Sequence, residues 1–191
     1  RVVFMNVYDF DNTIYDGESA VDFFLFCMRR YPSMIKLLPL IGVKLIKYKR
    51  CRISIEELEY FVSKYAKELL DKIKDVEGLV SEFWDKNMNK VKDFYKSQRK
   101  EDDLILSATA DFLLKEFSKR MKINYICSEI DLKTAQIHRI CFRSNKAEIL
   151  NELYPDIVIE NFYTDSMNDK PIINMAKNAF LVKGNKIKKI K

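Results

Sequence analysis

Glycine, proline and histidine are scarce in this chain of 191 residues, which contains 4 Gly, 4 Pro and a single His. So few turn-forming residues leave little room for long irregular loops. We find no low-complexity segment and no internal repeat, and 48% hydrophobic residues exclude the composition of a disordered chain. The single histidine, His138, lies in a basic, strand-like stretch, and we assign it no role.

Cys-x-x-Cys pairs are also absent, because the cysteines at positions 27, 51, 127 and 141 stand far apart. Three of them have apolar neighbours, which favours buried free thiols over disulfides or metal ligands. The sequence has no secretory signal and no apolar run long enough to span a bilayer. We therefore expect a reduced, cytoplasmic protein without a transmembrane segment.

Charged residues of both signs are common: 34 basic and 28 acidic residues give a formal net charge of +6. The excess favours anionic partners, but only weakly. The basic residues are scattered, apart from residues 47–52 and the tail at 183–191. A solvated surface accounts for most of them, and the length fits one domain or a core with a smaller insertion.

The hydrophobic pattern predicts an α/β fold with a parallel sheet and an all-helical insertion after the first strand. Residues 2–8 form an apolar run with high β-propensity, typical of a buried strand. The next stretch predicts helices only, over residues 19–30, 33–49, 54–70 and 78–96. Strands then alternate with helices. The strands are predicted over residues 103–108, 122–127, 135–142, 157–163 and 179–182, and the helices over 110–121, 144–153 and 169–177.

This pattern divides the chain into two predicted domains. Residues 1–16 and 99–191 would form a Rossmann-like catalytic core, and residues 17–98 a helical cap domain. The capping-box sequence Ser54-Ile55-Glu56-Glu57 is one start signal within the cap.

Four short polar segments follow predicted strands. They are Asp9-Phe10-Asp11-Asn12-Thr13, Ser107, Lys146 in Ser144-Asn145-Lys146, and Asp165-Ser166-Met167-Asn168-Asp169. Open α/β sheets place their ligand sites at the carboxyl ends of the strands. The set, in this order and spacing, resembles the haloacid dehalogenase superfamily of phosphatases and phosphotransferases. Within it, the small helical cap after the first strand is similar to the phosphoserine phosphatase-like branch.

Four carboxylates would meet at this edge of the sheet, from Asp9, Asp11, Asp165 and Asp169. Without a cation they would repel one another and raise one another's pKa. A hard divalent ion with oxygen ligands resolves this repulsion and also neutralises a phosphate, and Mg²⁺ is the ion we expect.

The resemblance implies a role for each residue. Asp9 would be the nucleophile that forms an aspartyl-phosphate, and Asp11 would protonate the leaving group and then activate water. Ser107 and Lys146 would hold the phosphoryl oxygens. Asp9, the backbone carbonyl of Asp11, and Asp165 would bind the metal. Asn168 and Asp169 would support it.

Asp11 bears on the reaction type. Dehalogenases of the superfamily lack a second aspartate there, because a halide leaves without a proton. An alkoxide leaving group needs one, so the sequence favours hydrolysis of a small phosphomonoester. The runner-up is a phosphotransferase that uses the same intermediate.

Glu18 stands where phosphoserine phosphatases carry an acid that faces the substrate amine. It would suit a cationic leaving group, but an acid in the first turn of a helix explains it equally well. Three features depart from those enzymes: residues 53–65 contain no Arg, Ala108 follows Ser107, and Ser166 follows Asp165. The substrate is therefore not assigned beyond a small phosphorylated metabolite.

The apolar and basic segment of residues 33–52 allows a further interpretation. It could lie on a membrane surface or line a pocket for a lipid-like phosphate, although packing within the cap is the plainer account. A non-catalytic basic module that binds membranes or nucleic acid is the alternative of a different class. Nothing in the sequence resembles a nucleic-acid-binding fold, so we expect no nucleic-acid partner.

Overall fold

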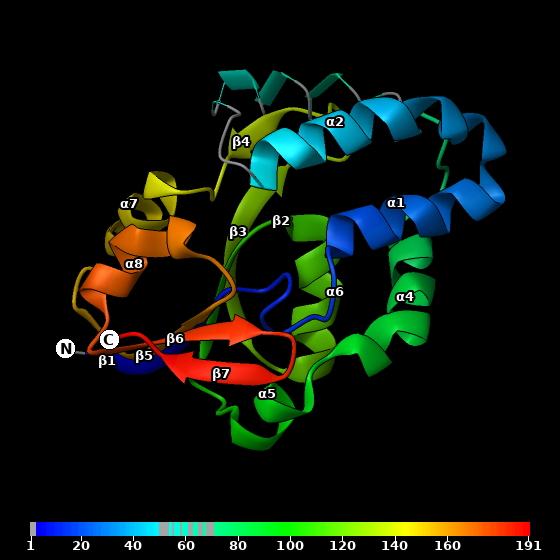
Figure 1. Ribbon diagram of the computed structural model, residues 1–191. Helices are drawn as coiled ribbons and strands as arrows, with labels where there is room; N and C mark the ends of the chain where they lie inside the picture. Colours follow the sequence, from blue (N-terminus) through cyan, green and yellow to red (C-terminus); the bar gives the residue numbers. More distant parts are fainter. Residues whose placement is uncertain are drawn as a thin grey trace.

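A twisted seven-stranded sheet with helices on both faces forms the centre of the protein (Figure 1). The computed structural model describes residues 3–49, 54, 56, 57, 59, 60, 63, 64, 67 and 71–191. The strands are β1 (Val3–Tyr8), β2 (Leu104–Ala110), β3 (Asn124–Ile130), β4 (Ile137–Arg139), β5 (Ile157–Thr164), β6 (Asn178–Lys183) and β7 (Lys186–Lys189).

The sheet has the order β4-β3-β2-β1-β5-β6-β7. The five strands from β3 to β6 are parallel, whereas β4 and β7 are antiparallel strands at the two edges. Strands β2 and β3 lie on one side of β1, whereas β5 and β6 lie on its other side. Doubly wound sheets bind ligands at such a switch in strand order, here between β1 and β5. The predicted α/β fold with a parallel sheet is confirmed, with antiparallel strands added at its edges.

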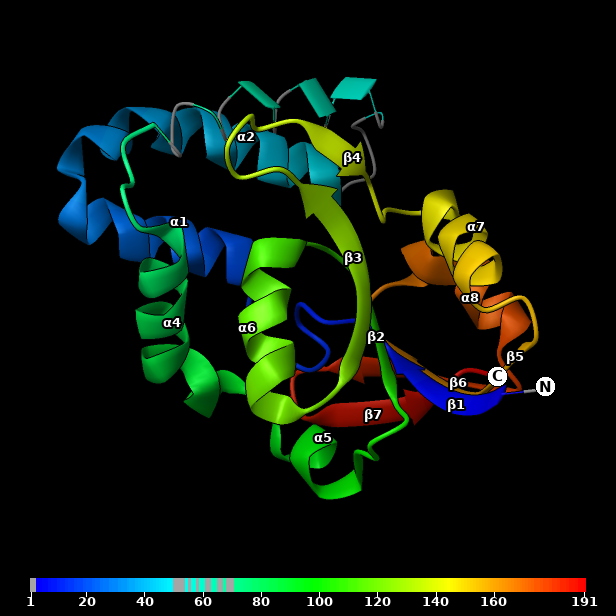
Figure 2. The same cartoon turned by 180° about the vertical axis from the view of Figure 1, so that it is seen from behind.

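Two hydrophobic layers, one on each face of the sheet, hold the helices in place. Successive side chains of a strand point to opposite faces, so they enter the two layers in turn. On β1, Met5 and Val7 pack beneath α7 (Ser144–Leu153) and α8 (Lys170–Met175). Tyr8, one residue on, packs on the opposite face with α6 (Asp111–Met121). Figure 2 shows the sheet between α6 on one side and α7 with α8 on the other.

The segment between β1 and β2 contains no strand among its described residues. It consists of α1 (Ser19–Arg30), η1 (Pro32–Leu37), α2 (Leu38–Lys49), α4 (Val76–Asn87), η2 (Met88–Lys90) and α5 (Asp93–Gln98). The predicted helix at 54–70 lies mostly outside the described residues. The Ser54 hydroxyl accepts a hydrogen bond from the Glu57 amide at 3.1 Å, as a capping residue would.

Two predicted helices differ from the structure. The helix predicted over 33–49 begins as the 3₁₀ helix η1, which has Pro32 in its first turn. The helix predicted over 78–96 is broken, because Val91 is extended and bridges to Tyr15. The backbone amide of Lys92 then bonds to the carbonyl of Ile14. Pairing with the loop after β1 has replaced the helical bonds at this point.

The basic tail was predicted only as a charged segment, with a strand over residues 179–182. The structure instead forms an antiparallel β6–β7 hairpin that turns at Gly184, which has φ +57°. The side chains of β7 are exposed, and three of its four residues are lysines. Lysine on an edge strand opposes pairing with another sheet.

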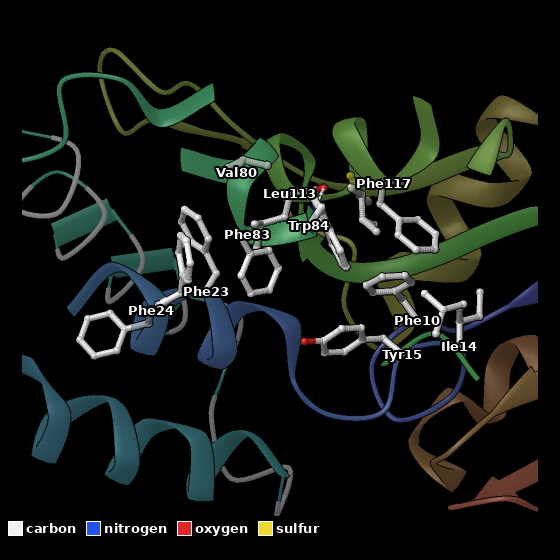
Figure 3. Close-up of a cluster of buried hydrophobic side chains, with 14 of the residues drawn as sticks. Phe10, Ile14, Tyr15, Phe23, Phe24, Val80, Phe83, Trp84, Leu113 and Phe117 are labelled. Carbon is white, nitrogen blue, oxygen red and sulfur yellow. Dashed lines mark hydrogen bonds between the residues drawn. The ribbon is translucent and has the colours of Figure 1, made fainter. Parts of the chain in front are cut away.

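An aromatic cluster joins the loop after β1 to α4 and α6, as Figure 3 shows. Phe10 lies edge-on to Phe117 with ring centroids 4.9 Å apart, and edge-on to Trp84 at 6.1 Å. The Trp84 indole N–H donates to the Leu113 carbonyl at 2.9 Å. One continuous core therefore connects the helical segment with the sheet, while the division into two domains stays a prediction.

Cys27, Cys127 and Cys141 are buried free thiols, as predicted. Among the described helices none is long and apolar enough to cross a bilayer.

Phe117→Ala should lower the free energy of unfolding by about 3–5 kcal/mol, because it removes a fully buried ring and leaves a cavity. Urea denaturation followed by circular dichroism measures this. Phe4→Ala is the matched control, since Phe4 is 51% exposed, and it should cost less than about 1 kcal/mol. Equal effects of the two substitutions would contradict the assignment of the core.

Candidate active site

A cleft of about 460 Å³ opens at the carboxyl ends of the central strands. All eight residues predicted from the sequence line it, and they come from five separate parts of the chain. They are Asp9, Asp11, Glu18, Ser107, Lys146, Asp165, Asn168 and Asp169. The topology explains the gathering, because β1, β2 and β5 run parallel and end at the same edge.

Asp9 is the first residue after β1, and its amide donates to the Tyr163 carbonyl at 2.8 Å. This bond fixes the backbone between the two strands at the switch point. Burial raises the pKa of Asp9 to about 8, and the carboxylates of Asp169 and Asp165 also raise it, against the lowering effect of Lys146. Burial thus disfavours the charged form of Asp9 more than any single neighbouring charge does.

Lys146 supplies that cation from the first turn of α7. Its ammonium group lies 2.9 Å from Asp9 Oδ1 and 3.0 Å from Asp169 Oδ1. The Thr164 hydroxyl, at the end of β5, donates to Asp169 Oδ2 at 2.8 Å. Because all of these side chains are largely buried, little water screens the contact.

Asp11 turns its carboxylate toward the helical segment. Oδ1 accepts from the Ser19 amide at the start of α1, and Oδ2 accepts from the Thr109 hydroxyl, both at 2.7 Å. Burial raises the pKa of Asp11 to about 6, and the charge of Glu18 raises it further while these bonds lower it. The carboxyl group is therefore held in one orientation and titrates near neutral pH.

Thr109 was missed by the sequence reasoning, although its position offers a signal. It follows Ser107 by two residues on β2, the spacing at which a regular strand returns to the same face. The Thr109 amide also donates to the Ser107 hydroxyl oxygen at 3.1 Å. One short segment thus places Ser107 at the cleft and orients Asp11.

The turn that carries Glu18 is built on Asn12. Asn12 has φ 59°, in the left-handed region that asparagine tolerates, and its amide nitrogen Nδ2 donates to Glu18 Oε1 at 2.7 Å. The buried Lys92 ammonium donates to the Asn12 carbonyl and, at 3.0 Å, to the Gly184 carbonyl. Lys92, which the sequence reasoning did not assign, therefore joins this turn to the β6–β7 hairpin.

Asp165 follows β5, and its backbone carbonyl accepts a hydrogen bond from Lys183 on β6. Burial raises the pKa of its side chain. Asn168 is exposed at the rim, where its amide donates to the Ser166 hydroxyl oxygen at 3.1 Å.

A cation site can be tested on this donor set. No group of three or more His, Cys, Asp or Glu side chains in the described part of the chain is arranged to hold a metal ion. The Asp11 carboxylate accepts bonds from Ser19 and Thr109, and Asp9 Oδ1 contacts Lys146, while Asp9 and Asp165, the two predicted carboxylate ligands, both line the cleft. Two carboxylates with a backbone carbonyl suit Mg²⁺, which keeps several waters of its own. The residues fit the ion.

The comparisons with known proteins agree with this geometry. The family model of haloacid dehalogenase-like hydrolases matches residues 7–173. A comparison with curated proteins gave no match.

Solved structures share the fold. A Bordetella pertussis Tohama I protein of unknown function has a TM-score of 0.74 at 18% identity, over 94% of this chain and 89% of that one. A phosphoserine phosphohydrolase-like protein from Francisella tularensis SCHU S4 gives 0.57 at 17%, over 93% and 86%. A phosphoserine phosphatase with an analogue of its phospho-aspartyl intermediate gives 0.54 at 14%, over 94% and 85%.

Lys146→Met should lower the free energy of unfolding by about 3–5 kcal/mol, because it leaves two buried carboxylates without their cation. Denaturant titration in metal-free buffer measures this. Lys96→Met is the matched control: its partner Asp93 is almost fully exposed, so the loss should stay below about 1 kcal/mol. A Lys146 variant as stable as the control would show that the buried contact is not formed.

Proposed function

The chain belongs to the haloacid dehalogenase-like hydrolase family, and from this premise we propose that it is a Mg²⁺-dependent phosphatase of small phosphomonoesters. The observation that carries the proposal is the largely buried Asp9 carboxylate, 2.9 Å from Lys146 in a cleft that Asp11 and Ser107 also line. A carboxylate nucleophile beside a cation and hydroxyl donors suits attack on a phosphoryl group.

In the first step an Asp9 oxygen attacks phosphorus, and the bond from phosphorus to the ester oxygen breaks. Asp11 gives its proton to that oxygen, and the alcohol leaves. In the second step Asp11 takes a proton from water as the water attacks the aspartyl-phosphate on Asp9. Phosphate departs, and both carboxyl groups return to their starting states.

The setting of Asp11 supports this double role. A pKa of about 6 allows the group to give and to take a proton near neutral pH. Its bonds to the Ser19 amide and the Thr109 hydroxyl hold it in place for both steps. Lys146 and Ser107 would bind the phosphoryl oxygens and offset the charge that develops on them.

Asp9, Asp165 and the carbonyl of Asp11 would hold Mg²⁺, and Asn168 and Asp169 would support it. When bound, the ion would neutralise charge on the phosphoryl group and let the anionic ester approach the carboxylates. Residues 17–98 would act as the cap over a small phosphorylated metabolite, with Glu18 at the substrate side, in a cytoplasmic protein. A phosphotransferase would use the same intermediate with an alcohol in place of water.

Asp9→Asn should abolish metal-dependent phosphate release, because a neutral amide cannot form the aspartyl-phosphate. The measurement is a phosphate-release screen over a metabolite panel, with Mg²⁺ and with EDTA. Asp93→Asn makes the same change at an exposed site and should keep full activity. If wild-type protein releases no phosphate from any compound while a known phosphatase does, the proposed function is wrong. With added acceptor alcohols, faster release of the leaving alcohol without a matching rise in free phosphate would identify the phosphotransferase.

Asp11→Asn should reduce hydrolysis of alkyl phosphates by about 10²–10⁴-fold, because their leaving groups need a proton. With p-nitrophenyl phosphate, whose leaving group departs as an anion, the first step should survive and the second should stall. Stopped-flow absorbance should then show a burst of nitrophenolate close to one equivalent of enzyme, followed by slow turnover. If the rate of hydrolysis fell equally on both substrates and no burst appeared, Asp11 would not be the residue that transfers these protons.

A further inference from the structure

Arg143 lies at the edge of the cleft in an unusual backbone conformation. It precedes α7, with φ 53° and ψ −123°. A residue with a side chain rarely adopts a positive φ, and holding it there is energetically unfavourable. Such conformations persist only where the surrounding structure holds them, and they cluster at active and ligand-binding sites, so the surroundings of the guanidinium group are informative.

The guanidinium group lies over the Phe142 ring, with Cζ 4.8 Å from its centroid. The two nitrogen atoms Nε and Nη2 are buried, and neither has a hydrogen-bond partner in the described part of the chain. These two atoms form one edge of the guanidinium plane, the edge that binds two oxygens of a carboxylate or phosphate at once. Leaving charged donors buried and unsatisfied is costly, so these two atoms gain from any hydrogen-bond acceptor that reaches them.

The other cations that line the cleft have hydrogen-bond partners within the protein. Lys146 contacts Asp9 and Asp169, Lys92 bonds to two backbone carbonyls, and Lys183 bonds to the Asp165 carbonyl. Among the described cleft residues, Arg143 thus differs in holding a pair of donors that the protein does not use.

Arg143 also lies close to Lys146, which would hold the phosphoryl group in the proposed reaction. Its carbonyl accepts the amide of Lys146, three residues on, so the two residues are one turn apart. Phe142 and Ala108 belong to one hydrophobic cluster, and both line the cleft. The wall therefore presents two cations with an apolar surface nearby, which suits a short carbon chain with an anionic group at each end.

We propose that Arg143 is a specificity-determining residue that binds a second oxyanion of the substrate, a carboxylate or a second phosphate on the leaving group. This rests on the proposed function, in which Lys146 and Ser107 hold the phosphoryl group that is transferred. Because Nε and Nη2 are buried, this binding requires the Arg143 side chain to change its torsion angles and turn that edge toward the cleft.

Three phosphates of two-carbon alcohols test the proposal. Ethyl phosphate has no second anion, phosphoglycolate adds a carboxylate, and ethanediol bisphosphate adds a phosphate. Steady-state kcat and KM are compared for wild-type protein, Arg143→Asn and Arg139→Asn. Asparagine tolerates positive φ, so the first variant removes the guanidinium group without adding backbone strain. Arg139 is an ion-paired residue on β4 outside the cleft lining, and its variant controls for the loss of one positive charge.

Wild-type protein should prefer phosphoglycolate, the bisphosphate or both over ethyl phosphate in kcat/KM, and the preferred compound identifies the source of the oxyanion. Arg143→Asn should lower that preference by roughly tenfold to a hundredfold, mainly through KM, and should leave ethyl phosphate unchanged. Arg139→Asn should keep the preference.

Two results would overturn the inference: a wild-type enzyme with no preference, or an Arg143 variant that loses activity on ethyl phosphate as much as on the dianions. The latter would place Arg143 at the transferred phosphoryl group. No hydrolysis of any phosphate would instead refute the proposed function. Titration calorimetry of phosphoglycolate and ethyl phosphate against the same three proteins then decides the role of Arg143, with equal affinities counting against it.

Discussion

The ammonium group of Lys146 lies between two largely buried carboxylates, and the geometry of the cleft depends on this contact. Asp9 comes from the end of β1, Asp169 from the turn after β5, and Lys146 from α7 on one face of the sheet. Burying any one of these charges alone would be strongly unfavourable. The three positions are therefore interdependent, and the contact fixes the helix against the edge where the two strands end.

The contact does not neutralise the site. The pKa of Asp9 is raised although Lys146 lies beside it, because burial and the carboxylates of Asp165 and Asp169 outweigh the cation. An anionic phosphoester entering this cleft would meet further negative charge. This unfavourable environment for negative charge is the physical argument for a divalent cation. Two lysines close to the cleft also offset the charge. Lys92 and Lys183 are held on backbone carbonyls near the same turn, where they add positive charge without cancelling a carboxylate.

Much of this arrangement could be predicted from the sequence, for identifiable reasons. The apolar run before Asp9 and the alternation of strands and helices predict a parallel sheet, and parallel strands place Asp9, Ser107 and Asp165 at one edge. The orientation of Asp11 could not be predicted, since it depends on the Thr109 hydroxyl 98 positions away. The break at Val91 was likewise hidden, because pairing with Tyr15 overrides a local helical pattern. The sequence gives no signal for Arg143, because its importance rests on a backbone angle and two nitrogen atoms without hydrogen-bond partners.

Phe10 shows how the hydrophobic core and the site are connected. It stands between Asp9 and Asp11, and its ring is fully buried against Trp84 and Phe117. The amide of Ile14 and those of its two neighbours bond back to the Phe10 carbonyl, so the loop turns tightly around this residue. Because the ring is anchored in the core, the carboxylates of the two flanking residues, Asp9 and Asp11, both line the cleft. The aromatic cluster beneath the helical segment thus sets the direction of the two acids, and it does so from residues that make no contact with substrate in the proposed reaction.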